Sequence, residues 1–132
     1  METLVVVSKL KKHVRELADM NTAANFAEEI SKIVHKSCMD AVERAKKAQR
    51  KTVMGRDFTL YVDDPQIKEV LVIASKIKKL IKESSDLSTS SQASDQLTVL
   101  VQRICDKAIQ NAKSDKRKTV MARDITQDVT TL

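Results

Sequence analysis

The sequence predicts an all-α protein built from two copies of one helical unit. Its 132 residues include a single Gly and a single Pro, and aromatic residues make up 2% while charged residues reach 32%. This composition suits long, solvent-exposed helices and leaves few residues for tight β-turns. An internal repeat is the second observation, because the segment RKTVMGRD at 50–57 returns as RKTVMARD at 117–124. Two copies of one unit are expected to bury their apolar faces against each other.

The repeat extends over almost the whole chain at a constant offset of 67 residues. Aligned without gaps, positions 4–65 and 71–132 share 23 identical residues. We therefore divide the chain into a first unit, 1–66, and a second unit, 67–132. Units of this length are near the lower limit for independent folding, so we expect them to share one core and form one compact pseudo-dimeric domain.

Composition also limits the classes of function. The net charge is +6 with a pI near 9.4, and this balance is compatible with nucleic acid as a partner. There is no apolar run of 18 residues and no signal sequence, so we expect a cytoplasmic protein without a membrane partner. Cys38 and Cys105 occupy equivalent positions in apolar surroundings and are expected to be reduced core residues.

Residues 4–17 form the first predicted helix. Apolar side chains recur at helical spacing, with basic side chains on the opposite face, and the second unit repeats the pattern. The expected inner residues are Val6, Leu10, Val14, Leu17, Ile73, Ile77, Leu80 and Ile81, and the outer ones are Lys12, Arg15, Lys79 and Lys82. His13 matches Leu80, which favours a packed imidazole over a catalytic one.

A long helix follows in each unit. Segments 19–22 and 86–89 are typical of loops and helix N-caps. From there the first long helix is predicted to reach Gln49, over about 27 residues and roughly 40 Å. Its expected buried face comprises Ala27, Ile30, Val34, Cys38, Ala41, Ala45 and Ala48, mirrored by Ser94, Leu97, Val101, Cys105, Ala108 and Ala112. Such a helix cannot bury its own stripe, so the two long helices should cross in an antiparallel handshake.

Each unit should end with an extended piece and a short third helix. Thr52-Val53 and Thr119-Val120 are the expected extended pieces because they are β-branched. The third helices would carry Phe58, Tyr61 and Val62 in one unit and Ile125 and Val129 in the other, with 130–132 fraying. Pro65 should stop the first of them.

The repeated motif Arg-Lys-Thr-Val followed by Arg-Asp, placed between a long helix and a short one, resembles the second loop and third helix of the histone fold. Two copies in one chain are similar to prokaryotic tandem histone doublets, which form an intramolecular pseudo-dimer. The resemblance implies short, long and short helices in each unit, and pairing of each extended piece with the first loop of the opposite unit. It also implies structural ion pairs between Arg50 and Asp57 and between Arg117 and Asp124.

The same resemblance implies contacts with DNA phosphates. The implied residues are Lys51, Thr52, Lys118, Thr119, Lys12, Arg15, Lys79 and Lys82. Two departures from the family stand out. The first loops, 18–21 and 85–88, contain no basic residue, and Arg44 and Lys47 stand where such histones stack one dimer on the next.

No catalytic or cofactor motif is present, so we predict neither an enzyme nor a bound cofactor. His35 and Cys38 are three residues apart on one helix, but the second unit has Gln102 in place of the His and no third metal ligand is evident. A single Gly excludes a Gly-rich phosphate loop.

Two functions remain open. The basic clusters around both second loops, with the outer faces of both first helices, favour a histone-like nucleoid protein that binds and bends double-stranded DNA through its backbone, with possible further self-association on DNA. The alternative is a histone-fold module that docks another protein. The modest charge, the bare first loops and the acidic residues of the first long helix favour this alternative: Glu28, Glu29, Asp40 and Glu43.

Overall fold

The computed structural model describes residues 3–58 and 60–125. Each unit contributes a short helix and then a long one. The helices are α1 (Val7–Ala18), α2 (Ala24–Lys47), α3 (Ala74–Ser85) and α4 (Gln92–Ser114). The remaining elements are β1 (Asn21–Thr22), β2 (Thr52–Val53), β3 (Ser88–Thr89), β4 (Thr119–Val120) and the 3₁₀ helices η1 (Gly55–Asp57) and η2 (Ala122–Asp124).

The short helices bury one face each, as predicted. Leu10 and Val14 of α1 are buried, and so are their equivalents in α3. Leu17 was expected in the same stripe, but its side chain is 53% exposed. It lies in the last turn of α1, where the equivalent residue of α3 is the exposed Ser84. This position therefore lies outside the core in both units.

The first helix starts three residues later than predicted because residues 4–6 pair with the other unit. Val5 forms an antiparallel bridge with Val72. The Val6 N–H donates to the Leu71 carbonyl, and the Ile73 N–H donates to the Leu4 carbonyl, both at 2.8 Å. This extended contact uses backbone groups that a helix would otherwise pair within itself.

The long helices supply most of the core. Of the predicted inner residues, those that are buried are Ala27, Ile30, Val34, Cys38, Ala41, Ala45, Leu97, Val101, Cys105, Ala108 and Ala112. Ser94 is half-buried, and Ala48 is exposed because α2 ends at Lys47 rather than at Gln49. Gln49 adopts a left-handed conformation, with φ of 58°, and the next N–H, that of Arg50, bonds back to the Ala45 carbonyl at 3.0 Å. This turn closes the helix.

The segments before the long helices form strands and not the predicted N-caps. β1 pairs with β4 and β2 pairs with β3, both in parallel, as two separate two-stranded sheets. Neither long helix has a side-chain cap hydrogen bond. The Asn21 side chain instead accepts a hydrogen bond from Arg15 at 2.6 Å. The expected pairing of Thr52-Val53 and Thr119-Val120 with the first loop of the opposite unit is confirmed.

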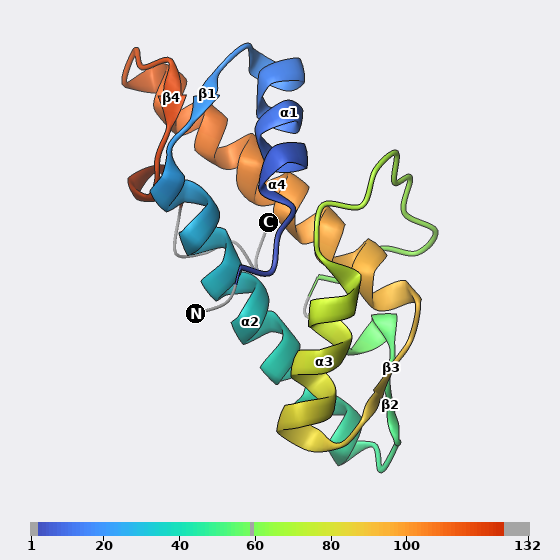
Figure 1. The fold of residues 1–132 in the computed structure, drawn as a ribbon. Coiled ribbons are helices and arrows are strands. Elements are labelled where there is room, and N and C mark those ends of the chain that lie inside the picture. Colours follow the sequence, from blue (N-terminus) through green and yellow to red (C-terminus); the bar gives the residue numbers. More distant parts are fainter. Residues whose placement is uncertain (1–2, 59, 126–132) are drawn as a thin grey trace.

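The strand pairing fixes the direction of the long helices. β1 precedes α2, whereas its partner β4 follows α4, and the reverse holds for β3 and β2. Each sheet therefore joins the start of one long helix to the end of the other, so α2 and α4 cross in an antiparallel handshake. Figure 1 shows the two sheets at opposite ends of the crossed pair.

The predicted third helix of the first unit is reduced to a single 3₁₀ turn. η1 covers only Gly55–Asp57, and the described residues from Phe58 to Val70 contain no helix. The side chain of Gln96 in α4 accepts a hydrogen bond from the Val62 N–H at 2.9 Å and donates one to the Val62 carbonyl at 2.7 Å. These contacts hold the segment extended across the opposite unit. In the second unit η2 is the equivalent turn, and the predicted helix around Val129 and the fraying segment 130–132 lie outside the described residues.

Candidate nucleic-acid interface

Lys51 lies beside the sheet formed by β2 and β3. Its carbonyl accepts a hydrogen bond from the Ser88 N–H at 2.9 Å, while its side chain is exposed. Thr52 follows in the strand and pairs with Ser88, and Val53, fully buried, pairs with Thr89. Alternation along the strand turns Val53 into the core. The backbone of Lys51 is therefore held in place by pairing between the loops of the two units.

Lys118 occupies the same position at the other end of the molecule. Its carbonyl accepts from the Asn21 N–H at 2.8 Å, and its side chain is exposed. Thr119 pairs with Asn21, and the fully buried Val120 pairs with Thr22. The two ends thus repeat one local geometry, as the 67-residue repeat predicts.

The side chains of Lys51 and Lys118 have no ion-pair or hydrogen-bond partner within the described part of the chain. Their neighbours behave differently. Arg50 pairs with Asp57, with Nη1 2.7 Å from Oδ2 and Nη2 2.5 Å from Oδ1. Arg117 pairs with Asp124 in the same way, at 2.9 and 2.5 Å. Both ion pairs implied by the resemblance are present, so these arginines are committed to the protein and the adjacent lysines are not.

The ion pairs organise the loops. Asp57 also accepts the Met54 N–H at 2.7 Å, and Arg50 also donates to the Thr52 carbonyl at 3.2 Å. Burial would raise the pKa of the Asp57 carboxyl, but the hydrogen bonds from Arg50 and Met54, with the charges of Arg50 and Arg56, hold that pKa below its usual range. The loop is thereby tied to η1 through one ionised side chain.

The second loop repeats this arrangement. The hydrogen bond from Arg117 lowers the pKa of Asp124 against the effect of burial, and the Met121 N–H and the charge of Arg123 add to the lowering. Asp115 gives Arg117 a further partner at 2.9 Å, which has no counterpart in the first loop because Ala48 stands there.

The four basic residues predicted on the short helices are exposed, but each has a carboxylate four residues further along the helix. The pairs are Lys12 with Glu16 at 3.9 Å, Arg15 with Asp19 at 3.8 Å, Lys79 with Glu83 at 4.0 Å and Lys82 with Asp86 at 3.2 Å. Exposed ion pairs of this kind contribute little to stability. A phosphate can therefore still reach the four basic side chains, although it must compete with the neighbouring carboxylates.

Sequence analysis missed two side chains that hold the loops. Arg44 donates to the Asp57 carbonyl at 2.7 Å, and Asn111, its equivalent, donates to the Asp124 carbonyl at 2.8 Å. Arg44 stands where related histones are expected to stack one dimer on the next, and its guanidinium is partly engaged in the fold. The available signal was that both equivalent positions carry a donor side chain.

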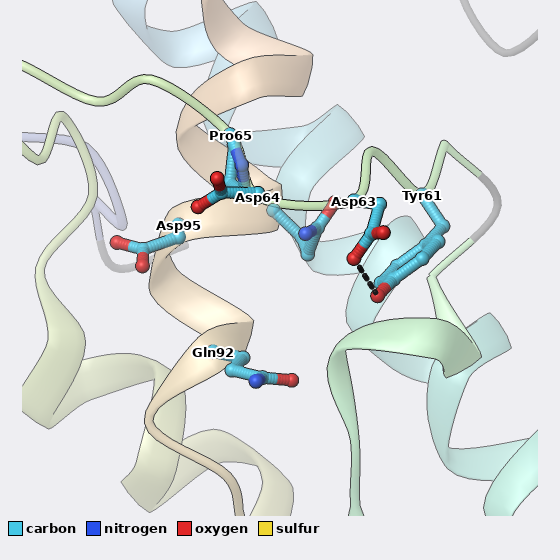
Figure 2. Close-up of a pocket in the computed structure, with 7 residues that line it drawn as sticks. Tyr61, Asp63, Asp64, Pro65, Gln92 and Asp95 are labelled. Atoms are coloured by element: carbon cyan, nitrogen blue, oxygen red, sulfur yellow. Dashed lines mark hydrogen bonds between the residues drawn. The ribbon is translucent and has the colours of Figure 1, made fainter.

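An acidic hollow of about 310 Å³ lies beside the start of α4. Figure 2 shows Asp63, Asp64 and Asp95 around it, with Tyr61 and Gln92, and the Tyr61 hydroxyl 3.4 Å from an Asp63 carboxylate oxygen. No basic residue lines it. A phosphate is therefore repelled from this face. In this respect the acidic hollow differs from the two loops that carry Lys51 and Lys118.

Neither thiol nor imidazole provides a reactive centre. Burial raises the pKa of Cys38 to about 12, and burial with the nearby charge of Asp106 does the same for Cys105. Both thiols are free and buried, which fits their predicted role in the core. His13 is half-buried, and its Nε2 atom is buried without a hydrogen-bond partner. Over residues 3–58 and 60–125, no group of three His, Cys, Asp or Glu side chains could hold a metal ion.

No described helix combines the length and the apolar character that crossing a bilayer would need.

Comparison with known proteins identifies the fold. No protein-family model matches the sequence, and no curated protein matches it. Among solved structures, the histone from Methanopyrus kandleri matches with a TM-score of 0.68 at 16% sequence identity. The match covers 97% of this chain and 99% of that chain, so it includes both units of the repeat.

Proposed function

Because the chain carries two histone folds in one polypeptide, we propose that it binds double-stranded DNA without sequence preference and bends it. The binding groups would be those named from the motif: Lys51, Thr52, Lys118, Thr119, Lys12, Arg15, Lys79 and Lys82. We further propose a histone-like role in the nucleoid, with one chain acting as the equivalent of a histone dimer.

The observation that carries this proposal is the pair of exposed lysines at opposite ends of the handshake. Lys51 and Lys118 have no partner among the described residues, and each stands on a sheet formed by both units. An ammonium group on a backbone fixed in this way can meet a phosphate without further loss of backbone freedom, so only side-chain freedom is lost. Two such grips at the ends of one rigid body favour a curved path of the duplex between them.

Double-stranded DNA is favoured over single strands as the partner. Aromatic residues make up only 2% of the sequence, which leaves little for stacking on unpaired bases. If the protein neutralises six to ten phosphates, raising the salt concentration from 50 to 200 mM should lower its affinity for DNA by about 10³- to 10⁵-fold. The salt dependence therefore reports how many contacts form.

The test is a gel-shift titration on random-sequence duplex. The variant Lys51→Gln/Lys118→Gln removes both proposed grips, and Lys36→Gln/Lys107→Gln is its control. Lys36 and Lys107 are exposed on the middle turns of the long helices, away from the loops. Because each variant replaces two lysines, the two variants have the same net charge. We expect weaker binding and a shallower salt dependence in the first variant only. Equal loss in both variants would remove the loops from the mechanism.

A protein partner is the second candidate function, favoured by the acidic hollow. Asp63, Asp64 and Asp95 present a concave anionic surface that suits a basic segment of another protein. The discriminating result would be no duplex binding at about 50 mM salt together with a defined complex that Asp95→Asn weakens. Duplex binding at that salt favours the first function, and light scattering with and without DNA would then report whether chains self-associate on it.

A further inference from the structure

Glu69, in the segment that joins the two units, lies against the basic face of α1. Its two carboxylate oxygens approach different lysines, with Oε1 3.7 Å from Lys9 Nζ and Oε2 3.8 Å from Lys12 Nζ. All three side chains remain partly exposed, at 38% for Glu69, 43% for Lys9 and 61% for Lys12. One carboxylate therefore shares a solvent-facing surface with Lys12, a candidate phosphate ligand, and with Lys9.

The backbone keeps this carboxylate near α1. Leu71, two residues after Glu69, is buried and is held on both sides. Its N–H donates to the Thr98 hydroxyl of α4 at 3.1 Å, and its carbonyl accepts from the Val6 N–H at the start of α1 at 2.8 Å. The backbone next to Glu69 is thus anchored by the same contacts that join the units, which keeps its side chain within reach of α1.

Within the described residues, a carboxylate from outside the helix contacts Lys12 of α1. The local pairs of Lys12 with Glu16 and of Lys79 with Glu83 are equivalent and occur in both units. Glu69 adds a second carboxylate to Lys12, and Lys79 has no such second partner within the described residues. The residue equivalent to Glu69 is Glu2, which lies outside those residues.

We propose that Glu69 sets the affinity of the α1 face by competing with DNA phosphates for Lys9 and Lys12. This inference rests on the proposed DNA binding and adds Lys9 to the contacting residues. A phosphate approaching α1 meets the negative charge of Glu69 and must replace it as the partner of both ammonium groups.

The experiment compares Glu69→Gln with Glu43→Gln on random duplex across a salt series. Glu43 is exposed on α2 and forms no ion pair within the described residues, and Gln110 stands at its equivalent position, so this control changes the net charge equally at a site that accepts a neutral side chain. Because an exposed ion pair contributes up to about 1 kcal/mol, we expect Glu69→Gln to bind about two- to fivefold more tightly than Glu43→Gln. Its salt dependence should steepen by up to about 0.9 for each phosphate gained.

A second comparison tests whether the lysines mediate the gain. In the background Lys9→Gln/Lys12→Gln, the further change Glu69→Gln should have no more effect than Glu43→Gln. Equal binding by Glu69→Gln and Glu43→Gln, or a gain that persists without the lysines, would overturn the inference while leaving DNA binding intact. Absence of duplex binding by both the wild type and Glu69→Gln at about 50 mM salt would overturn the proposed function and this inference together.

Discussion

Gln96 of α4 holds the backbone of Val62 through two hydrogen bonds, accepting from its N–H at 2.9 Å and donating to its carbonyl at 2.7 Å. Gln96 is 3% exposed. Because Val62 belongs to the first unit and Gln96 to the second, this contact fastens the segment after η1 across the handshake.

The variant Gln96→Glu should lower the free energy of unfolding. An ionised carboxylate cannot donate to the Val62 carbonyl and would repel it, and leaving a buried polar group unpaired costs about 1–3 kcal/mol. Urea denaturation would measure the loss. Gln110→Glu is the control, since Gln110 is exposed on α4 and Glu43 stands at its equivalent position in α2. Equal stability of the two variants would contradict the role of Gln96.

Acid should destabilise the protein through both loop aspartates. The pKa values of Asp57 and Asp124 are lowered in the folded chain from the usual 3.8, so the folded state binds fewer protons than the unfolded state. The stabilisation is therefore complete above the unfolded pKa and is lost as the pH falls through the lower, folded value. Denaturation of the wild type and of Asp57→Asn/Asp124→Asn from pH 7 to pH 2 measures this difference. The stabilities of the two proteins should converge in acid, and a constant difference would refute the assignment.

Alkaline pH should also destabilise the protein, through the two buried thiols. Cys38 and Cys105 have pKa values raised from 9.0 to about 12, so the unfolded state loses these protons first. Their contribution is present below pH 9 and declines as the pH rises toward 12. We also expect very slow reaction with a thiol reagent at pH 8 in the native state and rapid reaction in denaturant. Prompt labelling of the native chain would contradict the burial of the thiols.

Gly55→Ala should destabilise the first loop, and Gln92→Asn should partly restore it. A Cβ at Gly55 would lie 3.2 Å from the Cβ and Oε1 of Gln92, which is closer than ordinary contact. The second unit combines Ala122 with Asn25, whose side-chain oxygen accepts the Ala122 N–H at 3.2 Å. The double variant therefore transfers a pairing that the fold already accommodates. A double-mutant cycle by thermal denaturation should show a favourable coupling, and additive effects would exclude it.

Single substitutions should show that both ends of the molecule grip the duplex. Lys51→Gln and Lys118→Gln should each reduce the slope of log affinity against log salt by about 1, uniformly across sequences. The exposed Lys36→Gln is the single-site control. A change in slope at only one end would show that the chain binds through a single loop.

The sequence alone predicted the features that occur in both copies of the repeat. Buried positions of the long helices, the extended Thr-Val pieces and the Arg–Asp pairs recur at one offset, so each copy supports the interpretation of the other. The antiparallel handshake was also within reach, because a long apolar stripe requires a partner helix. The resemblance had already assigned Arg50 and Arg117 to ion pairs and the adjacent lysines to DNA contact, and the structure shows those ion pairs.

Tertiary contacts decided the features that depend on residues distant in the sequence. Pairing of residues 4–6 with 71–73 delays the start of α1, pairing of the first loops replaces N-caps with strands, and Gln96 holds the segment around Val62 extended where a helix was predicted. Glu69 is placed on α1 by the same kind of contact. Periodicity and propensity describe a segment and its near neighbours, whereas a backbone amide takes whichever partner the folded chain presents. That partner is known only once both units are joined.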